Sequence, residues 1–160
     1  MSTIHVRSGE GRHYPMIDGD HIAKATVHDA RGTFEVFEVT ASARPMSPPH
    51  VSPWSGVLFL LEGRITALVN GTSYDLEPGG LIVAPAGTPC TFEVVGESAR
   101  FLAITSGDGA GRFFADFADS VPADQPVDES MEAILSVTKR HGVALAGASA
   151  DPSLLSKDRA

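Results

Sequence analysis

Side chains able to carry out chemistry are few in this sequence, and most lie in two short segments, residues 48–63 and 78–92. The first segment contains His50, Ser52 and Trp54, and the second contains Cys90, the only cysteine in the chain. An imidazole titrates near neutral pH, so His50 is a candidate for proton transfer. The sequence has no glycine-rich phosphate loop, nucleophile elbow or cysteine pair. Chemistry around His50 is therefore the first hypothesis.

Short β-strands are predicted to position these residues. Alternation of apolar and polar residues, clear in 33–39 and 91–94, places one face of a strand in a core. Asn70-Gly71 predicts a tight hairpin because both residues accept positive φ, and 78–80 predicts another turn. The predicted strands are 21–27, 33–40, 57–61, 64–69, 72–76, 81–84, 91–95 and 100–105. Many short strands with frequent turns indicate a sandwich or barrel.

The pattern changes after Thr105, where 106–109 reads as a break. Aromatic residues then recur at helical spacing within 111–118, and 129–140 predicts a second helix after an N-cap at Asp128. The apolar face expected for this second helix consists of Met131, Ile134, Leu135 and Thr138. The predicted organisation is one domain, with a barrel and N-terminal strands over 1–106, packed helices over 107–146, and a flexible tail over 147–160.

The two segments resemble the paired motifs of the cupin family. In that pattern the first motif supplies two histidines, a glutamate and a closing glycine, and the second supplies a glycine, a proline, another glycine and a histidine. The spacing here matches at every step, with the backbone positions filled by Gly63, Gly79, Pro85 and Gly87. The resemblance covers about residues 30–106, and 111–142 looks like the helical tail of quercetin 2,3-dioxygenase-like bacterial cupins. It implies an all-β jelly-roll (double-stranded β-helix) barrel with a short helical C-terminus.

The four positions where cupins carry metal ligands are mostly replaced here. They hold His50, Ser52, Gly56 and Cys90, so only the first keeps the usual residue. A serine hydroxyl is a poor ligand, and glycine has no side chain to offer. First-row metals need at least three good donors. The sequence therefore predicts no metal, with His50 and Cys90 as the ligands if one divalent transition metal does bind, joined by a carboxylate such as Glu38.

Each of these residues also has a plainer interpretation. His50 is either a proton-transfer group or a remnant that only forms hydrogen bonds in the barrel. Cys90 is either a nucleophile or soft ligand, or a small buried apolar residue. Ser52 either donates a hydrogen bond to a ligand or fills vacated space, and Gly56 is expected to enlarge the cavity. Trp54 either stacks on a flat ligand or packs on the barrel rim.

Glu35 and Glu38 lie on opposite faces of one predicted strand, so at most one of them points inwards. Glu38 is counted with Trp54, Gly56 and Cys90 among the candidate substrate-binding residues.

The amino-acid composition limits which binding partners and which cellular compartment are expected. A formal net charge of −8 over 160 residues argues against nucleic acid and anionic membranes as partners. The N-terminus lacks the apolar run of a signal peptide, and no apolar stretch is long enough to span a bilayer. We expect a cytoplasmic protein with a small organic ligand. The cupin resemblance, together with exposed strand edges, further implies a homodimer.

The leading functional hypothesis is a metal-independent enzyme of secondary metabolism. It would catalyse a cyclisation, isomerisation or elimination on an apolar, aromatic or polyketide-like molecule, with His50 and Ser52 as the catalytic residues. The resemblance also leaves open a metal-dependent, quercetinase-like dioxygenase with ligands recruited elsewhere. A non-catalytic cupin that only binds a small ligand is the third hypothesis.

Overall fold

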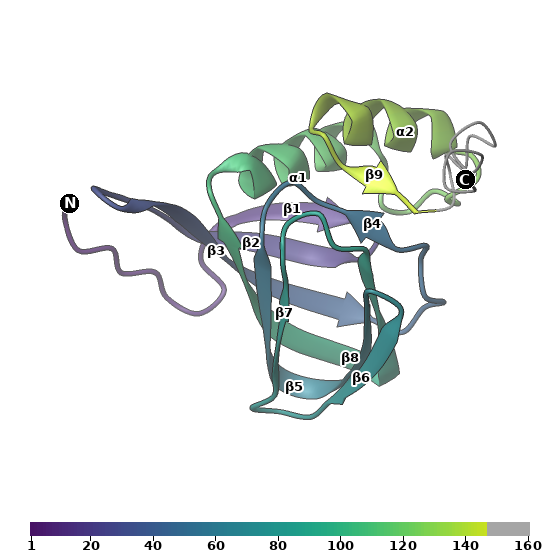
Figure 1. The fold of residues 1–160 in the computed structure, drawn as a ribbon, viewed down its shortest axis with the longest axis horizontal. Coiled ribbons are helices and arrows are strands. Elements are labelled where there is room, and N and C mark those ends of the chain that lie inside the picture. Colours follow the sequence, from purple (N-terminus) through teal and green to yellow (C-terminus); the bar gives the residue numbers. More distant parts are fainter. Residues whose placement is uncertain (147–160) are drawn as a thin grey trace, which may run out of the picture.

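A single antiparallel sheet that curls into a barrel makes up most of the molecule (Figure 1). The computed structural model describes residues 1–146, and the tail predicted for 147–160 lies outside the described residues. The strands are β1 (Arg12–Met16), β2 (Gly19–Asp29), β3 (Gly32–Ser42), β4 (His50–Val51), β5 (Gly56–Val69), β6 (Thr72–Leu76), β7 (Leu81–Ala84), β8 (Cys90–Ser106) and β9 (Ala144–Leu145), and the helices are α1 (Gly109–Ser120) and α2 (Met131–Arg140). The prediction of an all-β barrel with a short helical C-terminus is confirmed.

Strand β8 joins the two halves of the barrel. One path of neighbouring strands runs β1-β2-β3-β8-β4-β9, and β5 pairs with β6, β7 and β8. At the start of β8, Cys90 is the partner of both His50 in β4 and Val69 in β5. This junction brings residues from the two motif segments to the same place.

Strands β5 and β8 are each longer than the sequence predicts. The expected break near Gly63 is instead an irregularity in one continuous ladder between β5 and β8, with register shifts around Glu62. Gly63 has φ +83°, and a Cβ there would lie 2.4 Å from the Ser98 carbonyl oxygen. A bulge thus bends the strand without ending its pairing. The Asn70-Gly71 hairpin is as predicted, with both residues at positive φ.

Strands β1, β4 and β9 were not predicted. β1 contains Pro15 and pairs only with β2, so the residue lies on an edge strand, where a missing backbone donor is tolerated. β4 and β9 are two-residue strands that pair with each other. Such short segments carry no detectable alternation.

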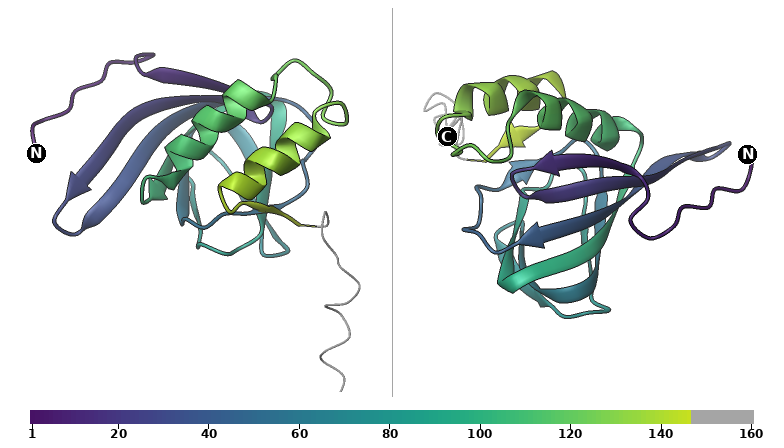
Figure 2. Two further views of the ribbon diagram at one scale, coloured as in Figure 1. Left: turned by 90° about the horizontal axis from the view of Figure 1, so that it is seen from above. Right: turned by 180° about the vertical axis from the view of Figure 1, so that it is seen from behind.

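The barrel core is formed by inward-facing residues of the long strands. Phe37, Val39, Leu60, Ile65 and Phe101 are almost fully buried there. A second apolar cluster lies between the barrel and the helices, and contains Phe113, Phe117, Ile134, Val137 and Val143. The two helices lie side by side over one end of the barrel (Figures 1 and 2).

The predicted face of α2 needs correction. Ile134 and Thr138 are buried as expected, but Met131 and Leu135 are 38% and 44% exposed. Val137 takes their place, because α2 is rotated so that Ile134 and Val137 join the cluster with Phe113 and Phe117 of α1. The helix also begins at Met131, two residues later than predicted, with Ser130 at the N-cap position in place of Asp128. Neither helix in residues 1–146 is long and apolar enough to cross a membrane.

Candidate functional site

A cavity of about 160 Å³ lies inside the barrel. Its walls are mainly apolar and are built by Val57, Leu58, Ala67, Val69, Ile82, Phe92, Phe101 and Phe114, among others. An engineered cavity of roughly 150 Å³ lined by such side chains is large enough to bind benzene. The space therefore suits a molecule, or part of one, of about one six-membered ring.

Five of the six site residues predicted from the sequence line this cavity. They are His50, Ser52, Trp54, Gly56 and Cys90. They come from β4, from the loop that follows it, and from the first residues of β5 and β8. The backbone N–H of Gly87 donates to the Ser52 carbonyl oxygen at 2.9 Å, so the two motif segments are also joined by a hydrogen bond.

His50 is the main titratable group of the cavity. Burial lowers the pKa of its imidazole, and the neighbouring imidazole of His21 acts in the same direction. The negative charge of Asp18 opposes this change without reversing it. The ring is therefore neutral at pH 7, which leaves one nitrogen free to accept a proton.

Cys90 is a poor nucleophile in this environment. Burial raises the pKa of its thiol, so the thiol stays protonated at neutral pH. Only a thiolate attacks carbon or binds a metal well. The structure therefore favours the role of a small apolar wall residue for Cys90.

Gly56 leaves space at the cavity. A Cβ built on Gly56 would meet no atom within 4 Å, so the position where cupins carry a glutamate faces open volume. Its backbone is outside the positive-φ region, so the glycine is not required by the fold.

Trp54 packs on the protein itself and also lines the cavity. Its ring packs against Phe113 of α1 with centroids 5.8 Å apart, and a Cβ on Gly109 would come within 3.3 Å of it. The same side chain lines the cavity. Trp54 thus connects the wall of the site to the first helix.

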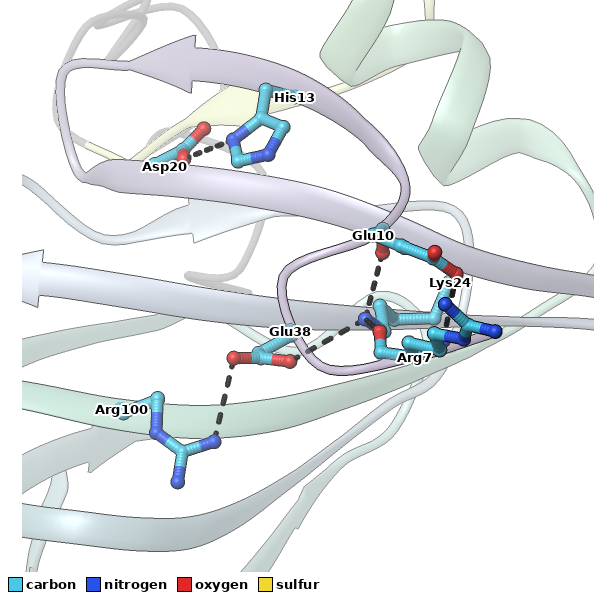
Figure 3. A network of polar contacts seen from close by, with 7 residues as sticks. All are labelled: Arg7, Glu10, His13, Asp20, Lys24, Glu38 and Arg100. Atoms are coloured by element: carbon cyan, nitrogen blue, oxygen red, sulfur yellow. Dashed lines mark hydrogen bonds and ion pairs between the residues drawn. The ribbon is translucent and has the colours of Figure 1, made fainter. Parts of the chain in front are cut away.

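The assignment of Glu38 to the cavity is wrong. Its carboxylate lies on the outer face of β3, where Lys24 and Arg100 approach it at 3.7 and 3.3 Å (Figure 3). Lys24 also donates to the carbonyl oxygens of Arg7 and Glu10, at 2.8 and 2.7 Å, and so ties the N-terminal segment to the barrel. The inward glutamate of this strand is Glu35, which is buried and accepts the Gly111 backbone N–H of α1 at 2.9 Å.

Sequence reasoning missed three residues that complete the site. Asp18 precedes β2, His21 lies within it, and both line the cavity together with Phe114 of α1. The His21 ring contacts Phe114 with centroids 4.5 Å apart, and its Nδ1 lies 3.1 Å from the Gly19 carbonyl oxygen. The only sequence signal was the turn-forming Asp18-Gly19 pair directly before a predicted strand.

These donors do not fit a metal centre. Asp18, His21, His50 and Cys90 all reach the cavity, yet no three His, Cys, Asp or Glu side chains within residues 1–146 converge on a point where an ion would bind. Since a first-row metal needs at least three donors at about 2 Å, the residues present do not fit the ion expected at a cupin site.

Comparisons with known proteins agree with this fold. Residues 37–105 match the family model described as "Cupin domain". Among solved structures, KdgF from Halomonas sp. superposes with a TM-score of 0.59 at 15% identity, over 67% of this chain and 96% of that one. The polyketide cyclase RemF from Streptomyces resistomycificus gives 0.51 at 24% identity, over 68% and 80%. A Streptomyces PAC13 variant with uridine gives 0.54 at 14% identity, over 66% and 83%. A search of curated proteins gives no match.

Proposed function

Because residues 37–105 are a cupin domain, we propose that the protein is an enzyme that transfers protons on a small organic molecule without a metal ion. The reaction belongs to the class of cyclisations, isomerisations and eliminations. On a carbonyl compound each of these reactions can proceed through the enol or enolate, which forms when a base removes a proton from the carbon next to the carbonyl group. General acid–base catalysis by one well-placed side chain accelerates such steps by about 10²–10⁴-fold.

The observation that carries the proposal is an imidazole that lines a mainly apolar cavity. Burial keeps His50 unprotonated at pH 7, and the cavity next to it is large enough for a ring. A base whose pKa lies below the ambient pH is in its unprotonated, active form. Ser52 lines the same cavity, and we assign its hydroxyl group as the hydrogen-bond donor that orients the substrate oxygen. Trp54 forms one wall of the cavity.

Cavity size limits the substrate. About 160 Å³ accommodates one ring, so a molecule with several fused rings would place only one of them beside His50. The similar fold of a polyketide cyclase supports cyclisation as a reaction that this barrel type can carry. Secondary metabolism is the setting that this likeness suggests.

Deuterium exchange at carbon tests the proposal without knowledge of the natural substrate. Cyclohexanone in D₂O exchanges its α-protons when a base removes them, and NMR follows the loss of signal. We expect the parent protein and an exposed-histidine control, His28→Gln, to accelerate exchange, and His50→Gln to lose the effect. Exchange no faster than in buffer, with saturable ketone binding, would instead assign the protein as a binding module.

Measurement of the metal content of the purified protein is the second test of the proposed function. Protein purified from medium containing iron, nickel, copper and manganese is expected to hold none of them stoichiometrically. A stoichiometric ion whose removal by EDTA abolishes exchange would overturn the metal-independent mechanism and favour a metal-dependent, quercetinase-like enzyme.

A further inference from the structure

We propose that Asp18 and His21, at the β1–β2 turn, form a hydroxyl-binding subsite that selects a neutral, hydroxylated single-ring ligand. This inference rests on the proposed function, because it assigns the ligand class of the same cavity. Both residues lie N-terminal to the segment that matches the cupin family model, and neither occupies a motif position.

Asp18 presents an unused acceptor. Its Oδ1 is inaccessible to solvent and has no hydrogen-bond partner among residues 1–146. The Nδ1 atom of His21 lies 4.0 Å from this oxygen, which is beyond hydrogen-bonding distance. A buried acceptor without a donor is costly, and more so when it is charged. A hydroxyl group from a ligand in the adjoining cavity would supply the missing donor.

The hydrogen bonding of His21 makes its free nitrogen a second acceptor. A carbonyl oxygen can only accept, so the 3.1 Å contact between His21 Nδ1 and the Gly19 oxygen requires the proton on Nδ1. In the neutral ring the lone pair is then on Nε2. The ring is held between this contact and the face of Phe114, 4.5 Å away between centroids. Asp18 and His21 thus each present a hydrogen-bond acceptor, and a hydroxyl group can donate to either of them.

Local charge favours a neutral ligand over a cation. The guanidinium of Arg44 lies close enough to Asp18 for their charges to interact, and its Nη2 is buried without a hydrogen-bond partner in the described part of the chain. The positive charge of Arg44 offsets part of the Asp18 charge, so an ammonium group would gain less attraction there. The remaining walls are apolar, which suits a ring. A phenol, an enol or a cyclic alcohol has this combination of properties.

Calorimetric titration with three probes of similar size tests the subsite. Resorcinol carries two hydroxyl groups, phenol carries one, and toluene carries none. A hydrogen bond to a charged acceptor corresponds to about a tenfold to hundredfold change in affinity. We expect resorcinol and phenol to bind the parent protein at least tenfold more tightly than toluene. Asp18→Ala should remove that preference and leave toluene binding within about twofold, whereas Asp119→Ala, at an exposed acid of α1, should change nothing.

Thermal unfolding gives a readout that needs no ligand. Asp18→Asn removes a carboxylate whose Oδ1 is buried without a donor among residues 1–146, so we expect Tm to rise by about 2–4 °C. A fall in Tm would show that the attraction between Asp18 and Arg44 outweighs the missing donor, and that result overturns the inference.

The binding results separate this inference from the proposed function. Equal affinities for toluene and resorcinol, no binding of any probe, or an unchanged preference in Asp18→Ala would each refute the subsite. Hydroxyl preference that is lost in Asp18→Ala, in a protein without His50-dependent exchange, would support the subsite and refute the catalytic role.

Discussion

Replacing Gly56 by leucine should fill the barrel cavity, stabilise the fold and block ligand binding. A side chain at this position enters open volume, since a Cβ would have no neighbour within 4 Å. The backbone there is outside the positive-φ region, so leucine introduces no strain. The substitution leaves every polar residue of the cavity unchanged in identity, which makes it a test of the space itself.

The magnitude follows from the cavity volume. A cavity of about 160 Å³ corresponds to roughly 4 kcal/mol at about 24 cal/mol per Å³, which is the upper limit for complete filling. Leucine fills only part of the volume, and the cavity is partly open to solvent. We therefore expect the free energy of unfolding to rise by about 1–2 kcal/mol, or Tm by about 2–8 °C for a chain of this size.

Urea unfolding and titration with phenol measure the two effects on the same samples. Gly56→Leu should raise the urea midpoint at an unchanged m-value and should abolish phenol binding. Gly56→Ala should lie between the parent and Gly56→Leu in both measurements. A lower midpoint, or phenol affinity equal to that of the parent, would refute the description of position 56 as open cavity.

Gly63→Ala is the matched control for glycine replacement in the same strand. Its Cβ would lie 2.4 Å from the Ser98 carbonyl oxygen, at φ +83°. Both conditions oppose a side chain, so the substitution should destabilise the fold by at least about 1–3 kcal/mol. Opposite signs for the alanine variants at positions 56 and 63 would separate a functional glycine from a structural one.

Three further predictions concern charged and titratable side chains. The Arg140 guanidinium and His141 hold the pKa of Asp116 well below its usual range. Because Asp116 is partly exposed, we expect Asp116→Asn to lower the free energy of unfolding by only about 1 kcal/mol at pH 7, as measured in urea. That difference should shrink as pH falls below about 4, where unfolded Asp becomes protonated; a constant difference down to pH 2 would contradict it. Burial lowers the pKa of His50, so below about pH 6.5 the unfolded chain binds more protons than the folded chain. Between about pH 7 and 5 the Tm of the parent protein should therefore fall more steeply than the Tm of His50→Gln. Parallel Tm curves would disprove this. Glu35→Ala should lower the free energy of unfolding by about 1.5–3 kcal/mol, because the Gly111 N–H loses its buried acceptor. Hydrogen exchange should then show faster opening of α1. Unchanged protection of the α1 amides would count against the contact.

Local sequence patterns predict most strands and turns of this barrel, because those features depend on neighbouring residues. The Asn70-Gly71 hairpin needs only two residues that accept positive φ, and both do so. The continuity of β5 through Gly63 was not predictable in this way. It depends on the β8 backbone that pairs on both sides of the bulge, which is distant in sequence.

The candidate site was predictable where motif spacing carried it. His50, Ser52, Gly56 and Cys90 meet at one cavity because barrel closure brings their segments together. Asp18 and His21 carry no such spacing signal, since the β1–β2 pairing that places them involves an edge strand without clear alternation.

Glu38 shows a different limit of sequence patterns. Apolar residues occupy both faces of β3, so the pattern alone does not tell which glutamate points inwards. In the structure Phe34 is 41% exposed, whereas Glu35 is only 6% exposed and has the α1 backbone as its partner.

The cavity draws its lining from three parts of the chain. Val57, Ile82 and Phe101 lie within the segment that matches the cupin family model, whereas His21 precedes that segment and Phe114 follows it. Two related chains with near-identical barrels could therefore accept different molecules through changes in their flanking residues alone. Attempts to redirect selectivity by directed evolution should accordingly randomise the β1–β2 turn and the inner surface of α1 before the barrel strands. Those flanking positions form part of the cavity wall, while the strands form its frame.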